Sequence, residues 1–172
     1  MAEQDSFDAL KRAQRKTIRL DPNLYWQTGA RAFVTIAVQS RQPVFLNHAL
    51  SEECVVTLKE QANHDGVSVI AYCFMPDHAH LLLQIDGAKG VVGFVRAFKG
   101  RTTRLAWSHG VDRILWQRSF YDHLLRESED VSKHIRYILE NPIRRGLVEN
   151  WRDYPFSGSL TVDLADDSIW DR

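Results

Sequence analysis

The segment His78-Ala79-His80 carries the residue types and spacing that most directly suggest chemistry in this chain of 172 residues. It begins the second of two adjacent apolar runs, and side chains two residues apart on a strand point to the same side. Both imidazoles are therefore expected on one face, roughly 7 Å apart along the strand. Two imidazoles held by a rigid strand can bind one divalent metal ion. The alternative is a polar strand face with two ordinary histidines.

A second group of interest is Tyr137 with Asn141, four residues later in a helix expected over about 131–141. Residues four apart lie on one side of a helix, here away from its apolar stripe, and His134 lies on the same side one turn earlier. An amide oxygen can bind a metal ion, and a phenol can act as a nucleophile when a metal or a base assists it. The pair could equally be a half-buried surface tyrosine and an asparagine at a helix end before Pro142.

The elements that must position these residues are predicted from apolar periodicity and turn residues. Pro76 removes a donor from the strand ladder and Asp77 favours a turn, so the runs on either side are expected to be adjacent strands. The last helix must end near Pro142, because the residue before a proline avoids the α region. The expected order is strand, helix, strand, strand, helix, strand, helix, at about residues 31–39, 51–63, 67–74, 78–85, 91–107, 114–126 and 131–141.

The first six of these elements match the ferredoxin-like (RRM-like) arrangement, a split βαβ pattern of the α+β class. Its sheet is antiparallel and carries helices on one face. We therefore expect the other face to be free to carry a site, and an additional C-terminal helix to carry Tyr137. The apolar stripe of that helix is expected to consist of Val131, Ile135, Ile138 and Leu139.

Size and composition indicate a single globular domain. The chain is 44% hydrophobic and 26% charged, which is ordinary for a globular protein, and its length suffices for one domain with a core. No run reaches the ~18 apolar residues of a membrane span, and the N-terminal residues do not resemble a secretory signal. A cytoplasmic protein with no membrane association is expected. Cys54 and Cys73 are expected to be buried, reduced thiols.

The charges cancel overall but are unevenly distributed. Residues 11–41 contain seven Lys/Arg and one Asp, and residues 89–145 contain twelve Lys/Arg and six Asp/Glu. Residues 42–88 and 146–172 are acidic. A neutral chain with such blocks can still present a basic surface to a polyanion. Scattered, solvated charge is the alternative, and the basic N-terminal residues could either follow phosphates or act as a solubilising tail.

Three motifs together carry a resemblance to a known family. They are MPDHAHLLL (75–83), WQRSFYDHLLR (116–126) and YILENPIRRGLV (137–148). In this order and at these spacings they resemble the single-tyrosine HUH transposases of the IS200-like fold, and more narrowly their REP-associated tyrosine transposase branch. Asparagine followed by proline, where insertion-sequence members more often have glutamine, points to this branch.

The resemblance implies roles for individual residues. His78, His80 and Asn141 match the family's ligands for Mg²⁺ or Mn²⁺, and Tyr137 matches its nucleophile. The implied activity is cutting and rejoining of single-stranded DNA at hairpin (REP-like) sequences through a 5′-phosphotyrosine. A monomer and a homodimer are both compatible with it. The basic residues that are candidate DNA contacts are Arg96, Lys99, Arg101, Arg104, Arg144 and Arg145.

The resemblance extends over most of the chain and divides it into three parts. We expect a basic N-terminal arm over residues 1–24, a catalytic domain over 25–159 and an acidic C-terminal tail over 160–172. The sequence contains no internal repeat or low-complexity tract that would suggest a further division.

Three other functions remain open from the sequence. The first is a protein of the same fold that binds hairpin DNA without cutting it. The second is a replication-type or conjugation-type HUH nickase, although those enzymes are typically larger. The third is a ferredoxin-like RNA binder, which the lack of an aromatic-rich strand of the RNP type disfavours.

We predict that DNA binding is electrostatic and selective for single strands. The basic stretch at 89–145 would neutralise phosphates and release their counterions, so the affinity should fall steeply with salt. For a hairpin with a single-stranded flank, we expect a loss of about 10³-fold or more between 50 and 200 mM salt if about six phosphates are contacted. Fluorescence anisotropy measures this. An affinity that is indifferent to salt, or a preference for blunt duplex, would contradict the prediction.

Overall fold

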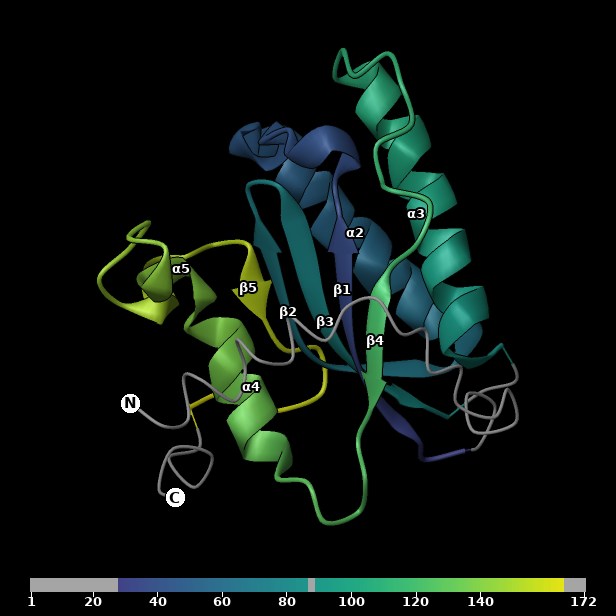
Figure 1. Ribbon diagram of the computed structural model, residues 1–172, viewed down its shortest axis with the longest axis vertical. Coiled ribbons are helices and arrows are strands. Elements are labelled where there is room, and N and C mark those ends of the chain that lie inside the picture. Colours follow the sequence, from purple (N-terminus) through teal and green to yellow (C-terminus); the bar gives the residue numbers. More distant parts are fainter. Residues whose placement is uncertain (1–27, 87–88, 166–172) are drawn as a thin grey trace.

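A five-stranded antiparallel sheet forms the centre of the protein (Figure 1), in the order β4-β1-β3-β2-β5. The first four strands alternate with two helices in the ferredoxin-like order, and β5 is added at one edge. The predicted α+β fold is therefore confirmed. The strands are β1 (Arg31–Ala37), β2 (Val67–Met75), β3 (His78–Ile85), β4 (Tyr121–Leu124) and β5 (Ser157–Gly158).

This computed structural model describes residues 28–86 and 89–165. The arm expected over 1–24 lies outside the described residues, as does 166–172 of the expected tail. Within the described part, no helix is both long and apolar enough to cross a membrane. Cys54 and Cys73 are free and buried, as predicted, and burial raises the pKa of both thiols.

The hairpin of β2 and β3 is the most buried part of the sheet. A turn at residues 76–77 joins the strands, and their register pairs Met75 with His78 and Cys73 with His80. Since residues directly opposite one another point to the same side of a sheet, the two histidines share a face with Met75 and Cys73. The intervening residues point to the other face. Both strands are buried on both sides over most of their length, which is typical of strands covered on both faces.

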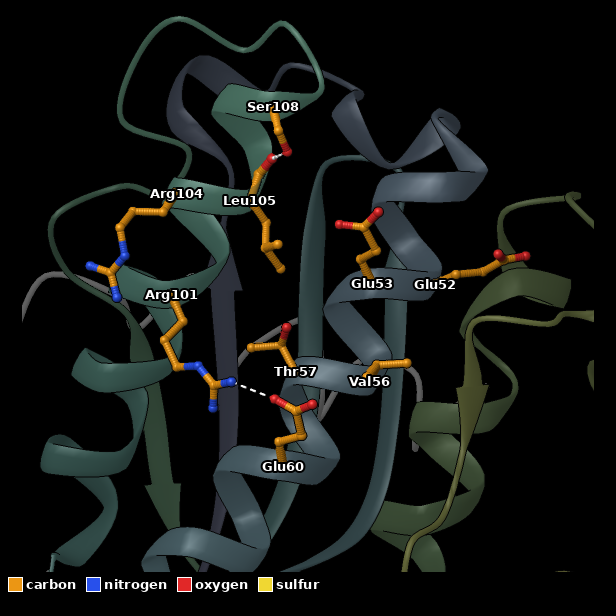
Figure 2. A pocket seen from close by; sticks show the side chains of 9 residues that line it. All are labelled: Glu52, Glu53, Val56, Thr57, Glu60, Arg101, Arg104, Leu105 and Ser108. Carbon is orange, nitrogen blue, oxygen red and sulfur yellow. Dashed lines mark hydrogen bonds and ion pairs between the residues drawn. The ribbon is translucent and has the colours of Figure 1, made fainter.

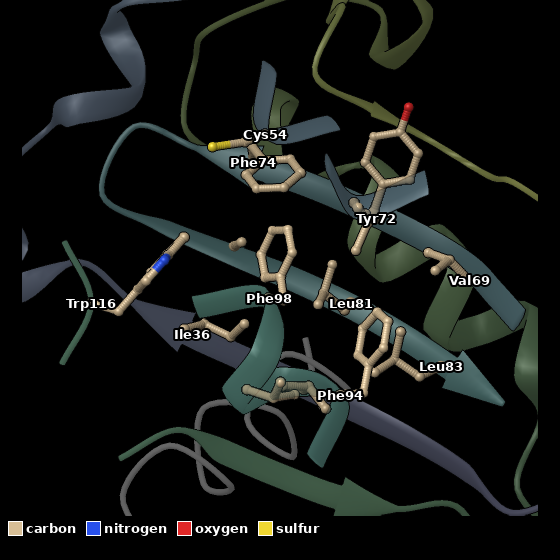
Figure 3. Close-up of a cluster of buried hydrophobic side chains, with 14 of the residues drawn as sticks. Ile36, Cys54, Val69, Tyr72, Phe74, Leu81, Leu83, Phe94, Phe98 and Trp116 are labelled. Carbon is tan, nitrogen blue, oxygen red and sulfur yellow. The ribbon is translucent and has the colours of Figure 1, made fainter. Parts of the chain in front are cut away.

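Helices α2 (His48–Asp65) and α3 (Gly90–Ser108) cover one face of the sheet. Their apolar side chains pack with those of the sheet into the larger of two hydrophobic clusters (Figure 3). Aromatic rings form its centre: the ring of Phe98 on α3 lies 6.1 Å from that of Phe74 on β2 and 6.3 Å from that of Trp116. This face of the sheet is therefore fully used for packing.

Helix α2 begins a turn earlier than the predicted residue 51 because a different side chain caps it. Asn47 is the N-cap, and its side-chain oxygen accepts from the backbone N–H of Leu50 at 3.2 Å. Ser51 is buried inside the helix and donates to the carbonyl of Phe45. Gly66 ends the helix with φ of 63°, a left-handed conformation that glycine adopts without steric cost.

Helix α4 (Val131–Leu139) covers the opposite face of the sheet, so the expectation that this face is free is wrong. Asp130 is its N-cap and accepts from the backbone N–H of Ser132 at 2.9 Å. An apolar patch on the sheet must be buried against another element, and α4 buries it. The second hydrophobic cluster consists of Phe33, Ile70, Ala71, Cys73, Met75, Leu82, Ile135, Ile138 and Leu139.

The strand predicted over 114–126 is much shorter, because only β4 at 121–124 joins the sheet. Before it, Trp116 forms an isolated bridge with Val38, and its indole N–H donates to the Thr102 hydroxyl at 2.8 Å. The Lys99 ammonium donates to the carbonyls of the next two residues, 117 and 118. These carbonyls are bound by a side chain rather than by a neighbouring strand.

The helix predicted over 131–141 is divided near its end. α4 ends at Leu139, and a short helix α5 (Asn141–Arg144) follows with Pro142 in its first turn. Proline is tolerated there because its missing N–H would have no partner in a first turn. Asn141 therefore begins a helix instead of ending one. The 3-10 helices of the described part are Gln39–Arg41, Val44–Leu46 and Trp151–Asp153.

Asp65, the last residue of α2, is a buried carboxylate whose charge is compensated. It accepts hydrogen bonds from Lys89, Gln61 and His64. Burial raises the pKa of Asp65, but these hydrogen bonds and the Lys89 charge outweigh it and hold the pKa below its usual 3.8. Because the folded-state pKa is depressed, this stabilisation is present above the unfolded-state pKa and is lost as the pH falls through the folded-state value.

Asp65→Asn is expected to lower the free energy of unfolding by about 1–3 kcal/mol at pH 7, because the ion pair with Lys89 is lost. The deficit should shrink at pH values below the usual carboxyl pKa of 3.8. Urea unfolding at pH 7 and at about pH 3 measures both. Asp112→Asn is the control, because Asp112 is exposed, and it should change stability by about 0.5 kcal/mol or less. Equal effects of the two substitutions would contradict the assignment.

Candidate active site between the sheet and helix α4

His78 and His80 form a close, buried pair on the face that α4 covers. Their Nε2 atoms lie 3.1 Å apart, and their rings stand nearly perpendicular at 85°. Each residue is 5% exposed. The sequence correctly placed both imidazoles on one side of β3, away from the larger core, but it did not indicate that they would be buried.

The outer nitrogen of each imidazole is held by a neighbouring side chain. Nδ1 of His78 lies 2.6 Å from a carboxylate oxygen of Asp77, and Nδ1 of His80 lies 2.8 Å from the hydroxyl of Thr35 on β1. Burial raises the pKa of Asp77, but the hydrogen bond from His78 and the charges of Arg41 and Arg145 outweigh it and lower the pKa. The ionised carboxylate can only accept, so His78 donates from Nδ1.

The surroundings of His78 favour its neutral form. Burial lowers the pKa of His78 more than Asp77 raises it, so the imidazole stays neutral near pH 7. With its proton on Nδ1, its Nε2 carries a lone pair that faces His80. The Thr35 hydroxyl can donate or accept. If the hydroxyl donates to Nδ1 of His80, the His80 proton is on Nε2 and lies between the two Nε2 atoms. If the hydroxyl accepts from Nδ1, the Nε2 atoms of both histidines carry lone pairs that face each other.

This arrangement fits a divalent metal ion. Two nitrogens that bind one ion at about 2.1 Å each, in adjacent positions, lie roughly 3 Å apart, and the observed separation is 3.1 Å. Metal-binding histidines usually donate their other ring N–H to a carboxylate or another oxygen. Asp77 and Thr35 are placed to accept in this way.

Tyr137 faces this pair from α4. Its ring lies 5.9 Å from the ring of His80 and 5.8 Å from that of Phe33, in edge-on arrangements. The side chain is half-buried and packs against the second hydrophobic cluster, so the expectation that it lies away from the apolar stripe of the helix is only partly correct. The guanidinium carbon of Arg144 lies 4.6 Å from the ring centre. The phenol thus lies between the sheet and a cation.

Asn141 is held at the junction of α4 and α5. It is buried, and its side-chain NH₂ donates to the backbone carbonyl of Tyr137 at 2.7 Å. This hydrogen bond fixes the orientation of the carboxamide, so that its NH₂ faces the Tyr137 carbonyl and its oxygen faces away from that carbonyl. A carboxamide oxygen in a buried position suits a hard divalent ion. Asn141 is therefore coupled directly to the backbone of the tyrosine that precedes it by one turn.

The other tyrosines of the described part are poorer candidates for a nucleophile. Burial raises the pKa of Tyr121, and the charge of Asp122 raises it further. Burial also raises the pKa of Tyr72 and Tyr154, and the Tyr154 hydroxyl donates to a backbone carbonyl at 2.7 Å. A raised pKa makes the reactive phenolate rarer. Tyr25, also considered from the sequence, lies outside the described residues.

The six basic residues expected to contact DNA lie in two places. Arg144 and Arg145 belong to the α5 end of the site, where Arg144 pairs with Glu140 at 2.9 Å and the charge of Arg145 acts on Asp77 and His78. The other four are on α3, which packs against the opposite face of the sheet. They are Arg96, Lys99, Arg101 and Arg104.

Two of the α3 residues line a cleft between α2 and α3 (Figure 2). Arg101 forms an ion pair with Glu60 on α2 and also donates to Gln61, whereas Arg104 is exposed. The cleft also contains Glu52 and Glu53. Its acidic residues make it a poor place for a phosphate, so any DNA contact from α3 would come from its outward side.

Comparison with known proteins identifies the family to which a chain with this geometry belongs. The profile of the family described as "Transposase IS200 like" matches residues 28–141, which include the histidine pair, Tyr137 and Asn141. The chain belongs to the IS200-like transposase family. This membership agrees with the three motifs that suggested it.

Relatives of this IS200-like chain carry a narrower name. A protein of Haemophilus influenzae, provisionally named a REP-associated tyrosine transposase, is 29% identical over 140 residues, covering 75% of this chain and 79% of that protein. The REP-associated tyrosine transposase of Escherichia coli is 24% identical over 153 residues, covering 83% and 89%. A solved REP-associated tyrosine transposase bound to a REP hairpin shares the fold, with a TM-score of 0.63 and 23% identity, covering 77% of this chain and 78% of that one. These relatives carry the name of the branch that the motifs suggested.

Sequence reasoning about this transposase missed two residues that orient the histidines. Asp77 was interpreted only as a turn residue, although its place directly before His78 was a usable signal. Thr35 gave no signal, because its contact with His80 depends on the register between β1 and β3, which pairs the two residues. Side-chain partners across a sheet follow from register, and register is set by the whole sheet.

His78→Ala and His80→Ala are each expected to abolish Mn²⁺ binding and DNA cleavage while the protein stays folded, because neither side chain belongs to the larger hydrophobic cluster on the other face of the sheet. Thr35→Val should weaken Mn²⁺ binding by about 10–100-fold, since it removes only the hydroxyl that orients His80. Isothermal titration with Mn²⁺ measures both effects. Thr57→Val, the same change at a buried threonine on α2, should leave the affinity unchanged. Normal Mn²⁺ binding by either histidine variant would show that the ligands lie elsewhere.

Proposed function

We propose that this chain is a metal-dependent transposase and endonuclease that cuts and rejoins single-stranded DNA at hairpin sequences through a 5′-phosphotyrosine on Tyr137. The observation that carries the proposal is the placement of the Tyr137 ring 5.9 Å from His80, one of two buried histidines with facing nitrogens. A phenol beside a potential metal site, in a chain of a transposase family, is the arrangement that this chemistry requires.

The residues that would hold the ion are His78, His80 and Asn141, and the ion would be Mg²⁺ or Mn²⁺. Bound there, it would polarise a non-bridging phosphate oxygen and offset its negative charge. The protein's own part is to orient the two imidazoles so that their Nε2 atoms face each other, through Asp77 and Thr35, and to fix the Asn141 carboxamide. Such preorganisation avoids reorienting the ligands when the substrate binds.

The proposed reaction exchanges one phosphodiester for another. The Tyr137 oxygen attacks the phosphorus, the bond from phosphorus to the 3′ oxygen breaks, and the phenolic proton ends on that 3′ oxygen. The products are a 5′-phosphotyrosine and a free 3′-OH. Because the phosphotyrosine keeps an ester bond in place of the one broken, attack by another 3′-OH reverses the step and joins strands without ATP.

The basic residues around Tyr137 support binding of a nucleic-acid backbone. Arg144 lies over the Tyr137 ring and Arg145 is exposed nearby, so both can meet phosphates that approach the phenol. Arg96, Lys99, Arg101 and Arg104 stay predictions for DNA that extends to the α3 side. A hairpin substrate is supported by the solved relative that is bound to a REP hairpin.

Tyr137→Phe is expected to bind hairpin DNA and Mn²⁺ but to form no covalent adduct. The substitution removes only a hydroxyl from a half-buried ring, so the free energy of unfolding should change by about 0.5 kcal/mol or less. A 3′-labelled oligonucleotide incubated with Mn²⁺ and wild-type protein, then denatured, should leave label on the protein. The same assay with Tyr137→Phe should leave none.

Tyr121→Phe is the matched control, because Tyr121 is the other half-buried tyrosine near the site. It should form the adduct. An adduct that persists in Tyr137→Phe, or that peptide mapping places on another tyrosine, would overturn the assignment of the nucleophile. If the wild type binds DNA but forms no adduct, the chain would instead be a hairpin-binding protein that does not cut. If it nicks a large DNA fragment without joining strands, a nickase would be favoured.

A further inference from the structure

A second group of metal-binding side chains lies beside the histidine pair. It consists of His123 on β4, Glu129 in the connection that follows and His134 on α4, and one ligand atom from each lies within 4.8 Å of the others. Nε2 of His123 lies 2.8 Å from Oε2 of Glu129, and Nε2 of His134 lies 3.8 Å from the same oxygen. The three residues come from three consecutive segments of the chain.

This group is separate from the proposed catalytic site. The ring of Phe33 on β1 contacts both groups, at 5.5 Å from the His80 ring and 6.1 Å from the His134 ring. The two groups share no residue. An ion at one of them would therefore not use the ligands of the other.

Hydrogen bonds outside the group orient two of the three side chains. Nδ1 of His134 lies 3.0 Å from the backbone carbonyl of Asp130, so it donates there and leaves Nε2 as the nitrogen that faces Glu129. The other carboxylate oxygen of Glu129, Oε1, accepts from the backbone N–H of Arg126 at 3.1 Å. Each of these hydrogen bonds is the kind of outer contact that fixes a metal ligand.

We infer that His123, Glu129 and His134 form a second metal site, specific for a Zn²⁺-like transition-metal ion. Two ligand atoms on a tetrahedral Zn²⁺ at about 2.1 Å lie roughly 3.4 Å apart, and the two observed nitrogen–oxygen separations, 2.8 and 3.8 Å, bracket this value. Two imidazoles and one carboxylate, with a water as fourth ligand, suit Zn²⁺ better than Mg²⁺. Glu129 and His123 are partly exposed, which gives the ion a path of entry.

The consequence of the inference is a link between the tyrosine helix and its own sheet. His134 lies three residues before Tyr137 on α4, whereas His123 is paired with Phe33 in the sheet. An ion bound by both would close the segment from 124 to 133 into a loop and hold the beginning of α4 against β4. This link would exist whether or not Tyr137 is a nucleophile, so it stands apart from the proposed function.

Zn²⁺ binding to the full chain tests the inference directly. We expect His123→Asn and Glu129→Gln each to bind one Zn²⁺ fewer per chain than wild type, or to bind it at least 100-fold more weakly, in a competition titration with a zinc indicator. Both residues are partly exposed, so both variants should stay folded. His109→Asn is the matched control, because it breaks a histidine–glutamate pair with Glu53 at 3.2 Å, outside this group. It should bind as many ions as wild type.

A measurement on the wild type alone gives an independent result. Diethylpyrocarbonate labelling followed by peptide mapping should show His123 protected at least fivefold by Zn²⁺ added in excess of both candidate sites, and His109 not protected. Equal zinc binding by His123→Asn and wild type, or no protection of His123, would overturn the inference and leave an ordinary ion pair. Retained labelling protection in the Tyr137→Phe variant is also expected, which separates this result from any failure of the proposed function.

Discussion

The separation of 3.1 Å between the Nε2 atoms of His78 and His80 is the constraint on which the rest of the site depends. Two imidazoles this close under a covering helix cannot both be charged without a large cost, because neither can be solvated freely. Asp77 and Thr35 meet the outer nitrogens, so the inner pair is left to share a proton or a cation. The two imidazoles are thus held in place by hydrogen bonds on their outer nitrogens, independently of any ion or substrate.

Helix α4 closes the site and supplies the remaining groups. Its apolar residues Ile135, Ile138 and Leu139 are buried against the sheet. This packing fixes the position of the helix and thereby places the Tyr137 ring beside that of His80. The Asn141 side-chain NH₂ donates to the carbonyl of Tyr137, so the proposed nucleophile and the amide are held together. His78 and His80 are each only 5% exposed, so a phosphate that reaches them would require a local rearrangement of the site.

The sequence was sufficient for β1, β2 and β3 and for the shared face of His78 and His80, because local patterns encode them. The apolar runs around Pro76 and the alternation at His78 and His80 predicted a hairpin with both imidazoles on one side, and both features are found. The covered face, the short β4 and the Thr35 contact were not predictable in this way. Each depends on packing or register between segments that are separated in sequence. The short β4, for example, follows two residues whose backbone carbonyls accept hydrogen bonds from the Lys99 side chain.

Crystals soaked in Mn²⁺ and measured at the manganese absorption edge would show whether His78 and His80 hold an ion, because anomalous scattering locates the ion without reference to activity. We expect a peak within about 2.3 Å of Nε2 of both His78 and His80, with the Asn141 side-chain oxygen as a further ligand and the Tyr137 hydroxyl beside it. A peak confined to His123, Glu129 and His134, or no peak between His78 and His80, would contradict this expectation.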